Sequence, residues 1–370
     1  MRIVVKVGTS TLAYATGRLN IRHTEQLVKV LSDLKNEGHE VILVSSGAIG
    51  MGVGKLSLPT RPKDTTTKQA CAAVGQCELM YTYDRLFNAY NHTVAQILLT
   101  GVDVEHTERR VNFQNTLSRL LELGALPIIN ENDTVATDEI TSIGDNDTLA
   151  ALVSCLVSAD LCVTLSDIDG LYTANPHEDP TAEFVPVVHK IDAKIIASAG
   201  DSSTSVGTGG MITKIRASRI LMTAGIQSVI CSGEEPDALV RLARGESVGT
   251  LFDPPAERLD IAPRKLWIAL GDNAHGSVTV DDGAAKALVG HGSSLLAVGI
   301  REVDGEFAEG DVLDVCDPSG MVVARGIAEA DSDVLELAAG RRQDQIASNR
   351  LLANLAEKPA IHRDNLIVFA

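Results

Sequence analysis

Residues 207–214, GTGGMITK, place three glycines and Lys214 within eight positions. A glycine-rich segment that leads into a helix presents unpaired backbone N–H groups and the positive end of the helix dipole, and both favour an anion. The segment is not the usual P-loop, because Met211, Ile212 and Thr213 separate the last glycine from the lysine. An apolar helical stripe begins near Met211, so Lys214 falls in the first turn of the expected helix. The segment therefore predicts a phosphate site of another type.

Two further segments near the N-terminus have anion-binding character. Lys6 lies inside the apolar run IVVKV (3–7) and is followed by the turn-like GTS. A lysine on an edge strand is also ordinary, so this signal is weak by itself. Residues 45–55, SSGAIGMGVGK, lack the full G-x-G-x-x-G spacing and the later acidic residue of a dinucleotide-binding fold. Their closely spaced glycines are still expected to expose backbone N–H groups to an anion.

Polar residues also gather after two later strands. The segments INENDTVAT (129–137) and GDNDTLAAL (144–152) bring Asp145, Asn146 and Asp147 to the mouth of a helix. Asn and Asp are favoured helix caps, but three such residues exceed what one cap requires. The loop LSDIDGLYTANP (165–176) contains D-x-D-G without the remaining ligands of a calcium loop. These segments predict a polar binding site and no protein-built metal site.

The elements that would position these residues alternate between strands and helices up to about residue 250. Apolar residues at helical spacing predict helices around 27–34, 117–121, 149–156 and 217–224. Short β-rich runs predict strands at 3–7, 41–45, 94–99, 126–130, 161–165 and 228–231. This alternation predicts an α/β fold with a mainly parallel sheet sandwiched by helices. In such sheets, ligands bind at the carboxyl ends of the strands.

Length and punctuation predict two domains. A chain of 370 residues is too long for one ordinary core. The Pro- and charge-rich stretch DPPAERLDIAPR (253–264) is the candidate linker. Beyond it, short alternating runs such as SVTV, VLDV and MVVARGI surround one helical segment, GAAKALV. We expect domains at 1–255 and 274–370, the second one small and β-rich.

Charge and composition exclude some classes of function. The net charge of −17 argues against nucleic acid as the main ligand, because such proteins normally carry a basic surface. Residues 273–370 hold eight Lys or Arg against sixteen Asp or Glu, so the tail is not basic either. No run approaches the ~18 apolar residues that span a bilayer, and we expect a cytoplasmic protein without a membrane segment. The six cysteines form no C-x-x-C pair and are interpreted as reduced core thiols.

Taken in order, these segments resemble the motifs of the amino acid kinase family, and the tail resembles a PUA domain. The kinase-like motifs are VVKVGTS, SSGAI, KQACAAVGQ (68–76), INENDTVAT, GDNDTLAAL, LSDIDGLYTANP and GTGGMITK. The PUA-like ones are GSSLLAVGI (292–300) and EGDVLDV (309–315). The resemblance implies an amino acid kinase-like fold with a PUA-like domain. It also implies that ATP phosphorylates the side-chain carboxylate of L-glutamate, as the first step of proline biosynthesis.

The resemblance gives each candidate residue an expected role. Lys6 and Lys214 would neutralise charge on the transferred phosphoryl group, and Asp147 would hold both lysines. Ser46 would help to bind glutamate, with Asp133 and Asn146 at its α-amino end. Mg²⁺ would bridge the phosphates of ATP. The residues expected along ATP are Lys6, Ser166, Asp167, Thr208, Gly209, Gly210, Met211, Ile212, Thr213 and Lys214.

The resemblance further implies feedback inhibition by proline, a homo-oligomer, and the next enzyme of the pathway, glutamyl phosphate reductase, as a partner. A carboxylate with a pKa near ~4.3 is already anionic at neutral pH and needs no general base. That agrees with a sequence in which no His-centred catalytic pattern is recognised. Two rival hypotheses stay open here: another carboxylate kinase, such as an acetylglutamate kinase, and an RNA-binding or regulatory protein that acts through its PUA-like tail.

Overall fold

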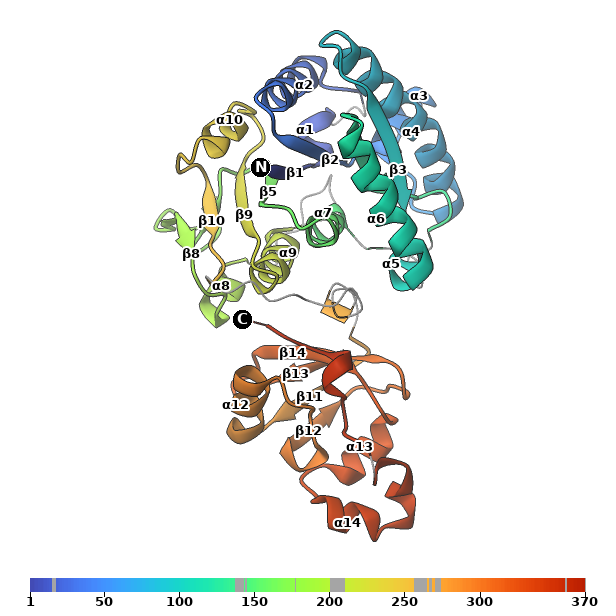
Figure 1. The fold of residues 1–370 in the computed structure, drawn as a ribbon, viewed down its shortest axis with the longest axis vertical. Coiled ribbons are helices and arrows are strands. Elements are labelled where there is room, and N and C mark those ends of the chain that lie inside the picture. Colours follow the sequence, from blue (N-terminus) through green and yellow to red (C-terminus); the bar gives the residue numbers. More distant parts are fainter. Residues whose placement is uncertain are drawn as a thin grey trace. The chain divides into compact units, whose positions relative to one another are not determined.

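The chain divides into two compact units, Met1–Arg258 and Leu259–Ala370 (Figure 1). The computed structural model describes residues 1–14, 18–136, 143, 145–176, 178–199, 210–255, 265, 268–269, 274–356 and 358–369. In this described part of the chain, no helix combines the length and apolar character needed to cross a membrane.

An eight-stranded sheet forms the centre of the N-terminal unit, in the order β3-β4-β2-β1-β5-β9-β10-β8. The strands from β3 to β9 in this order run parallel, whereas β10 is antiparallel to β9. Their bounds are β1 Arg2–Val7, β2 Glu40–Ser45, β3 Val94–Leu99, β4 Leu126–Glu131, β5 Leu161–Ser166, β8 Val187–Val188, β9 Gln227–Ser232 and β10 Thr250–Phe252. The predicted mainly parallel sheet is confirmed. The short β8 and β10, and the hairpin of β6 Leu171–Tyr172 with β7 Phe184–Val185, were not predicted because two or three residues carry no alternation.

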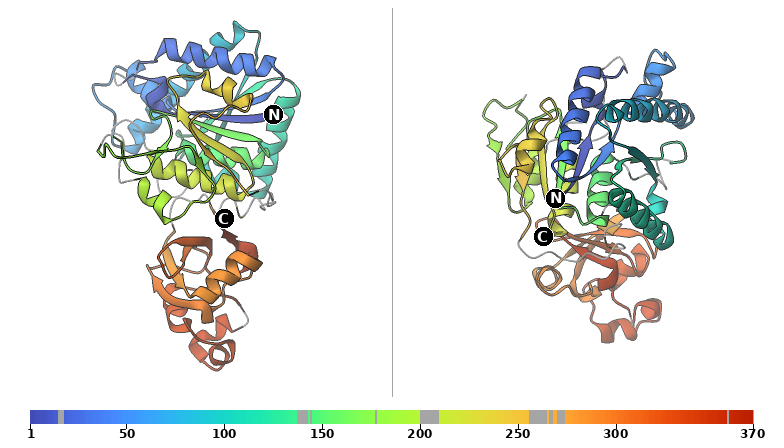
Figure 2. Two further views of the ribbon diagram at one scale, coloured as in Figure 1. Left: turned by 90° about the vertical axis from the view of Figure 1, so that its left-hand side faces the viewer. Right: turned by 45° about the horizontal axis from the view of Figure 1, so that its top comes forward.

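Helices cover both faces of this sheet (Figures 1 and 2). On one face, α2, α4 and α10 pack against the sheet through a core that includes Leu31, Leu79 and Leu239. On the other face, α6 contacts β4, α7 contacts β1 and β5, and α9 contacts β9. The helices are α1 Thr9–Leu12, α2 Ile21–Asn36, α3 Ala48–Lys55, α4 Thr65–Asn88, α5 Gly101–Glu105, α6 Thr107–Glu122, α7 Asn146–Leu156, α8 Ala193–Ser198, α9 Met211–Thr223 and α10 Ala238–Ala243.

The glycine-rich segment after β2 forms a helix, α3, which its closely spaced glycines did not predict. Gly47 caps α3 with a left-handed φ of 105°, which glycine adopts without strain and which turns the chain out of β2. Gly52 and Gly75 then allow α3 and α4 to pack closely. A Cβ on Gly52 would lie 1.9 Å from the carbonyl oxygen of Cys71, and one on Gly75 would lie 1.7 Å from that of Ala48.

The C-terminal unit contains a five-stranded sheet in the order β12-β11-β13-β14-β15, which confirms the expected β-rich domain. Its strands are β11 Gly276–Val280, β12 Ile300–Asp304, β13 Val312–Cys316, β14 Val322–Ile327 and β15 Leu366–Val368. The helices α13 and α14 were not predicted, because their apolar stripes are short. The helical elements are α12 Asp282–His291, α13 Ser332–Ala338, α14 Gln343–Ala347 and the 3₁₀ turns η1 Ala297–Gly299, η2 Arg350–Leu355 and η3 Arg363–Asn365.

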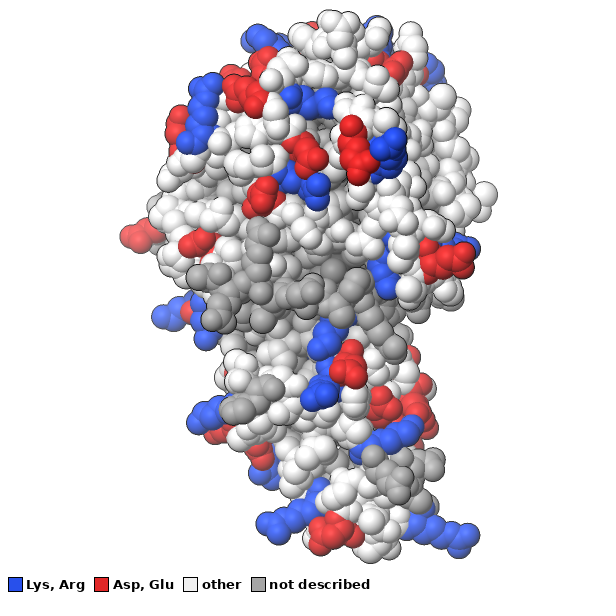
Figure 3. Space-filling model, viewed as in Figure 1, with Lys and Arg blue, Asp and Glu red and all other residues white. Residues whose placement is uncertain are grey.

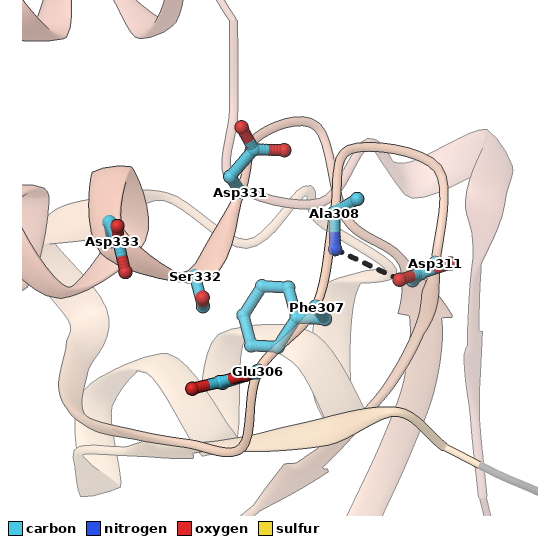
Figure 4. Close-up of a pocket in the computed structure, with 7 residues that line it drawn as sticks. All are labelled: Glu306, Phe307, Ala308, Asp311, Asp331, Ser332 and Asp333. Atoms are coloured by element: carbon cyan, nitrogen blue, oxygen red, sulfur yellow. Dashed lines mark hydrogen bonds between the residues drawn. The ribbon is translucent and has the colours of Figure 1, made fainter.

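A cavity of about 540 Å³ lies in this unit beside the loop that joins β12 to β13 (Figure 4). Two of its carboxylates brace the loop: Asp311 accepts the Ala308 N–H at 2.9 Å, and Asp331 accepts the Glu309 N–H at 2.7 Å. The acidic lining repels phosphate groups, so this cavity does not suit a nucleic acid. Its described lining residues are Glu306, Phe307, Ala308, Asp311, Asp331, Ser332 and Asp333.

The contact between α3 and α4 predicts that Gly75→Ala destabilises the N-terminal unit. A methyl group there must push the helices apart, and overpacking of this kind costs about 1–3 kcal/mol. Gly50→Ala is the matched control in α3, because its Cβ would meet only the Thr9 methyl group at 3.4 Å. Thermal unfolding should give a lower Tm for Gly75→Ala and an unchanged or higher Tm for Gly50→Ala. Equal Tm values would contradict the packing argument.

Candidate active site

The candidate residues gather where the order of strands reverses around the central strand β1. The next strand in the chain, β2, pairs with one side of β1, and β5 pairs with the other side. Lys6 is near the end of β1, Ser46 directly follows β2, and Ser166 ends β5. Ligands of parallel sheets bind at such a switch point, outside the carboxyl ends of the strands.

One carboxylate joins two lysines from distant parts of the chain. Asp147, in the first turn of α7, lies 2.6 Å from Lys6 Nζ through Oδ1 and 3.2 Å from Lys214 Nζ through Oδ2. The Thr213 hydroxyl donates to Asp147 Oδ2 at 2.9 Å. Lys6, Lys214 and Asp147 are 6%, 8% and 1% exposed. Because β1 is a central strand, the interpretation of Lys6 as an ordinary edge-strand lysine is wrong.

The charges of the two lysines determine the ionisation of Asp147. Burial by itself raises the pKa of this carboxyl, but the Lys6 and Lys214 charges and the hydrogen bonds from Lys6 and Thr213 lower the pKa to about 2. The carboxylate is therefore ionised at neutral pH. The three side chains together carry a charge of about +1, which favours an anion next to the lysines.

The N-terminal turns of α7 and α9 position Asp147 and Lys214. Asp145 caps α7 by accepting the backbone N–H groups of Asp147 at 2.7 Å and Thr148 at 2.9 Å, as expected for this polar triplet. Gly210 precedes α9 and offers no side-chain cap. The first backbone N–H groups of α9 therefore point to a site that suits an anion, and Lys214 lies in the same turn, as predicted.

A second polar cluster surrounds Ser46. The Asn146 side chain donates from Nδ2 to Ser46 Oγ at 2.8 Å and to Asn130 Oδ1 at 3.1 Å. Asn130 Nδ2 in turn donates to Gln76 Oε1 at 3.0 Å. Asp133 is half-buried in the turn that follows β4. Ser46 and Asn146 are thus in contact, as their expected shared role requires.

A cavity of about 300 Å³ lies beside Lys214, mostly lined by apolar surface. The Ser166 hydroxyl donates to Asp167 at 3.1 Å, and both residues line the cavity. Of the expected nucleotide segment, Gly210, Met211 and Lys214 line it too, whereas Thr208 and Gly209 lie outside the described residues. Ile212 follows in α9, and the Thr213 hydroxyl is directed to Asp147. The other lining residues are Ile168, Leu171, Tyr172, Ala174, Asn175, Pro176, Ser198 and Ala199.

The comparisons with known proteins agree with this arrangement. The model of the amino acid kinase family matches residues 1–232, and the PUA domain model matches residues 276–348. Glutamate 5-kinase of Caldanaerobacter subterraneus subsp. tengcongensis is 47% identical, over 100% of this chain and 98% of that protein. Those of Carboxydothermus hydrogenoformans and Myxococcus xanthus are each 46% identical, over 99% of this chain and 97% and 96% of theirs. The chain belongs to the glutamate 5-kinases of the amino acid kinase family.

The amino acid kinase unit contains polar contacts that the sequence did not predict. Asn130 lies in the recognised motif INENDTVAT and Gln76 ends the motif KQACAAVGQ, but nothing marked them as partners. Tyr83 is fully buried, and its hydroxyl lies 2.9 Å from Ser45 Oγ, next to Ser46. Gln76 and Tyr83 both come from α4, whose 24 residues were not predicted as one helix. The sequence signal that could have indicated them is the spacing of seven residues between Gln76 and Tyr83, which places both side chains on one face of a helix.

The buried position of Asp147 predicts a large stability loss in Asp147→Asn. The variant leaves Lys6 and Lys214 without their counter-charge, and removal of one partner from a buried ion pair costs about 3–5 kcal/mol. Urea unfolding at pH 7 measures this loss. Because the folded-state pKa of about 2 lies below the ordinary value of about 3.9, the stabilisation is complete above pH ~5 and is lost as the pH falls through the folded-state pKa. The difference between wild type and variant should therefore shrink from pH 5 towards pH 2. A loss below about 1 kcal/mol at pH 7 would refute this view of the ion pair.

Proposed function

We propose that this protein transfers the γ-phosphate of ATP to the side-chain carboxylate of L-glutamate, which gives L-glutamyl 5-phosphate and ADP. The observation that carries the proposal is the buried Lys6–Asp147–Lys214 cluster, in which Lys214 lines the cavity beside α9 and Asp147 directly follows Asn146 of the Ser46 cluster. The relatives named glutamate 5-kinase, identical at 42–47% of positions, support the same substrate and the same first step of proline biosynthesis.

The nucleotide would occupy the cavity beside α9. Its mostly apolar lining suits a base, while Ser166 and Asp167 lie along the same wall. The phosphates would lie at the start of α9, against the first backbone N–H groups of the helix and Lys214 Nζ. The segment Thr208–Lys214 would thus wrap the phosphates, in agreement with a phosphate site that is not a P-loop.

Glutamate would lie on the opposite side of the lysines, at Ser46. The Asn146 nitrogen already donates two hydrogen bonds, to Ser46 and Asn130, so within the described part of the chain its Oδ1 is the atom left for a ligand. That oxygen and the Asp133 carboxylate suit the α-ammonium group. The Ser46 oxygen accepts from Asn146, which leaves its O–H to donate to a carboxylate oxygen of the substrate.

The chemistry then needs positioning and charge neutralisation. An oxygen of the ionised side-chain carboxylate attacks the γ-phosphorus, and the bond from that phosphorus to the β–γ bridging oxygen breaks as ADP leaves. Lys6, on β1, and Lys214, on α9, neutralise the negative charge on the equatorial oxygens of the phosphoryl group as it is transferred. Asp147 keeps both ammonium groups in place, and no residue has to take up a proton.

Mg²⁺ would reach the site on the phosphates. Among the residues that the structure describes, no group of three His, Cys, Asp or Glu side chains is arranged to hold a metal ion. Mg²⁺ commonly binds through substrate phosphates and waters with few protein ligands, and this site fits that mode. When bound, the ion neutralises phosphate charge.

Each part of the chain has a proposed role. Residues 1–255 would bind both glutamate and ATP, and residues 274–370 would form the PUA-like domain. Proline would inhibit by competing near the glutamate site, and the protein would act in the cytoplasm as a homo-oligomer that passes its product to glutamyl phosphate reductase. RNA binding is disfavoured, because Lys and Arg are interspersed with Asp and Glu on the face in Figure 3. One assay tests the activity: ATP consumption with glutamate, aspartate or N-acetylglutamate, with hydroxylamine to trap acyl phosphate.

We predict that removal of either Lys6 or Lys214 causes a large loss of kcat. Lys6→Ala and Lys214→Ala each remove a fixed cation from the transferred phosphoryl group, and the loss of one such contact typically lowers kcat by ~10²–10³-fold. Lys55→Ala is the control, because Lys55 is an exposed lysine that pairs only with Glu78 among the described residues. Steady-state kinetics and circular dichroism separate a catalytic loss from unfolding. Near-normal kcat in a folded Lys214→Ala variant would refute the phosphate site at α9.

The charge of Asp133 predicts the choice of substrate. N-acetylglutamate brings no ammonium group to the Asp133 carboxylate, and the loss of such a charged contact costs about 1–3 kcal/mol. We expect N-acetylglutamate to be a very poor substrate. Asp133→Ala should raise the KM for glutamate at least about tenfold, while the KM for ATP stays within about twofold. Asp33→Ala, an exposed position on α2, is the control. If N-acetylglutamate is phosphorylated as well as glutamate, the proposed substrate is wrong.

A further inference from the structure

Three polar side chains on α4, spaced seven residues apart, face the glutamate side of the active site. Gln69 Nε2 donates to the carbonyl oxygen of Ala136, in the loop that follows Asp133, at 3.2 Å. Gln76 accepts from Asn130 at 3.0 Å, and Tyr83 contacts Ser45 at 2.9 Å. A spacing of seven residues keeps side chains on one face of a helix. This face of α4 therefore contacts three segments that surround the proposed glutamate site.

The contact of Gln76 begins a chain of amides with a defined direction. Asn130 donates to Gln76 Oε1, Asn146 donates to Asn130 Oδ1, and the same Asn146 nitrogen donates to Ser46. Asn130, in the middle of this chain, accepts a hydrogen bond from Asn146 through its oxygen and donates one to Gln76 through its nitrogen. The orientation of one amide thus fixes the orientation of the next.

Gln76 contacts Asn130 through its amide oxygen and not through its amide nitrogen. Its side chain belongs to a residue that is only 8% exposed, and its Nε2 is a buried atom without a hydrogen-bond partner among the described residues. Buried amide nitrogens are rarely left without an acceptor. The contact that keeps this amide in place is the bond that Oε1 accepts from Asn130.

We propose that Gln76 is a positioning residue that sets substrate specificity by fixing the direction of this amide chain. The inference rests on the proposed function, since it concerns how the same site reads the α-amino end of glutamate. With Gln76 Oε1 accepting, Asn146 is turned so that its Oδ1 is available to the ammonium group. In a reversed chain, Asn146 would present its NH₂ group there instead and repel the ammonium group.

Gln76→Met tests the proposal, because methionine has a similar length and cannot accept the Asn130 hydrogen bond. Glutarate is the probe, since it keeps both carboxylates of glutamate and lacks the ammonium group. We expect the preference for glutamate over glutarate, as the ratio of kcat/KM values, to fall about tenfold or more. Where glutarate gives no turnover, its inhibition constant replaces its kcat/KM. The KM for ATP should stay within about twofold of wild type.

Two further variants separate positioning from support of the fold. Gln76→Glu keeps an oxygen acceptor for Asn130 and should retain the preference for glutamate, even where its kcat/KM is lower. Gln114→Met removes a glutamine that donates to the Leu156 carbonyl oxygen at 2.9 Å on α6, and should leave the preference unchanged. Thermal unfolding checks that each variant is folded.

The outcomes are distinct. A folded Gln76→Met variant with the wild-type preference overturns the role of Gln76 and leaves the proposed kinase activity intact. Loss of the preference in a folded Gln76→Glu variant overturns it too, and this variant decides the matter where Gln76→Met does not fold. A wild-type protein that phosphorylates no glutamate overturns the proposed function, and this inference with it.

Discussion

A single buried carboxylate holds the proposed catalytic centre of this protein together. Asp147 is 1% exposed and neutralises two ammonium groups that come from the first strand and from a helix about two hundred residues later. Without Asp147, the two buried ammonium groups of Lys6 and Lys214 would repel each other. Burying both charges would then lower the stability of the fold. With Asp147, the cluster keeps one surplus positive charge at the place where we propose that the phosphoryl group is transferred. Stability and proposed catalysis therefore depend on the same contact.

The sheet and its covering helices keep that contact in register. Period-two alternation in β1 directs Ile3, Val5 and Val7 into the core with α2 and α4, so Lys6 points to the opposite face, where α7 carries Asp147. The close glycine contact between α3 and α4 fixes the segment after β2, and α4 then braces the Ser46 side through Gln76 and Tyr83. Helix packing thus supports the proposed glutamate site, and ion pairs support the proposed phosphate site.

Much of this could be predicted from the sequence, because the strands are apolar runs and several candidate site residues lie at their ends or directly after them, as Ser166 and Ser46 do. The start of α9 at Met211 and the cap at Asp145 came from local rules for helix ends. Other features depend on contacts between distant segments. The glycines at 50, 52 and 54 did not predict a helix, and only a carbonyl group of α4 explains why α3 needs Gly52. Likewise, Gln76 gains its meaning from Asn130, which lies 54 positions away.

The most direct test of the central claim is a crystal structure of the protein with ADP, Mg²⁺, aluminium fluoride and L-glutamate. Aluminium fluoride takes the place of the phosphoryl group in transfer. We predict that Lys6 Nζ and Lys214 Nζ both lie within hydrogen-bond distance of it, about 2.7–3.2 Å, with Asp147 still between them. The side-chain carboxylate of glutamate should lie in line with the ADP oxygen, on the opposite side of the fluoride group. A complex in which neither lysine contacts the fluoride, or in which the glutamate carboxylate is directed away from it, would contradict the account.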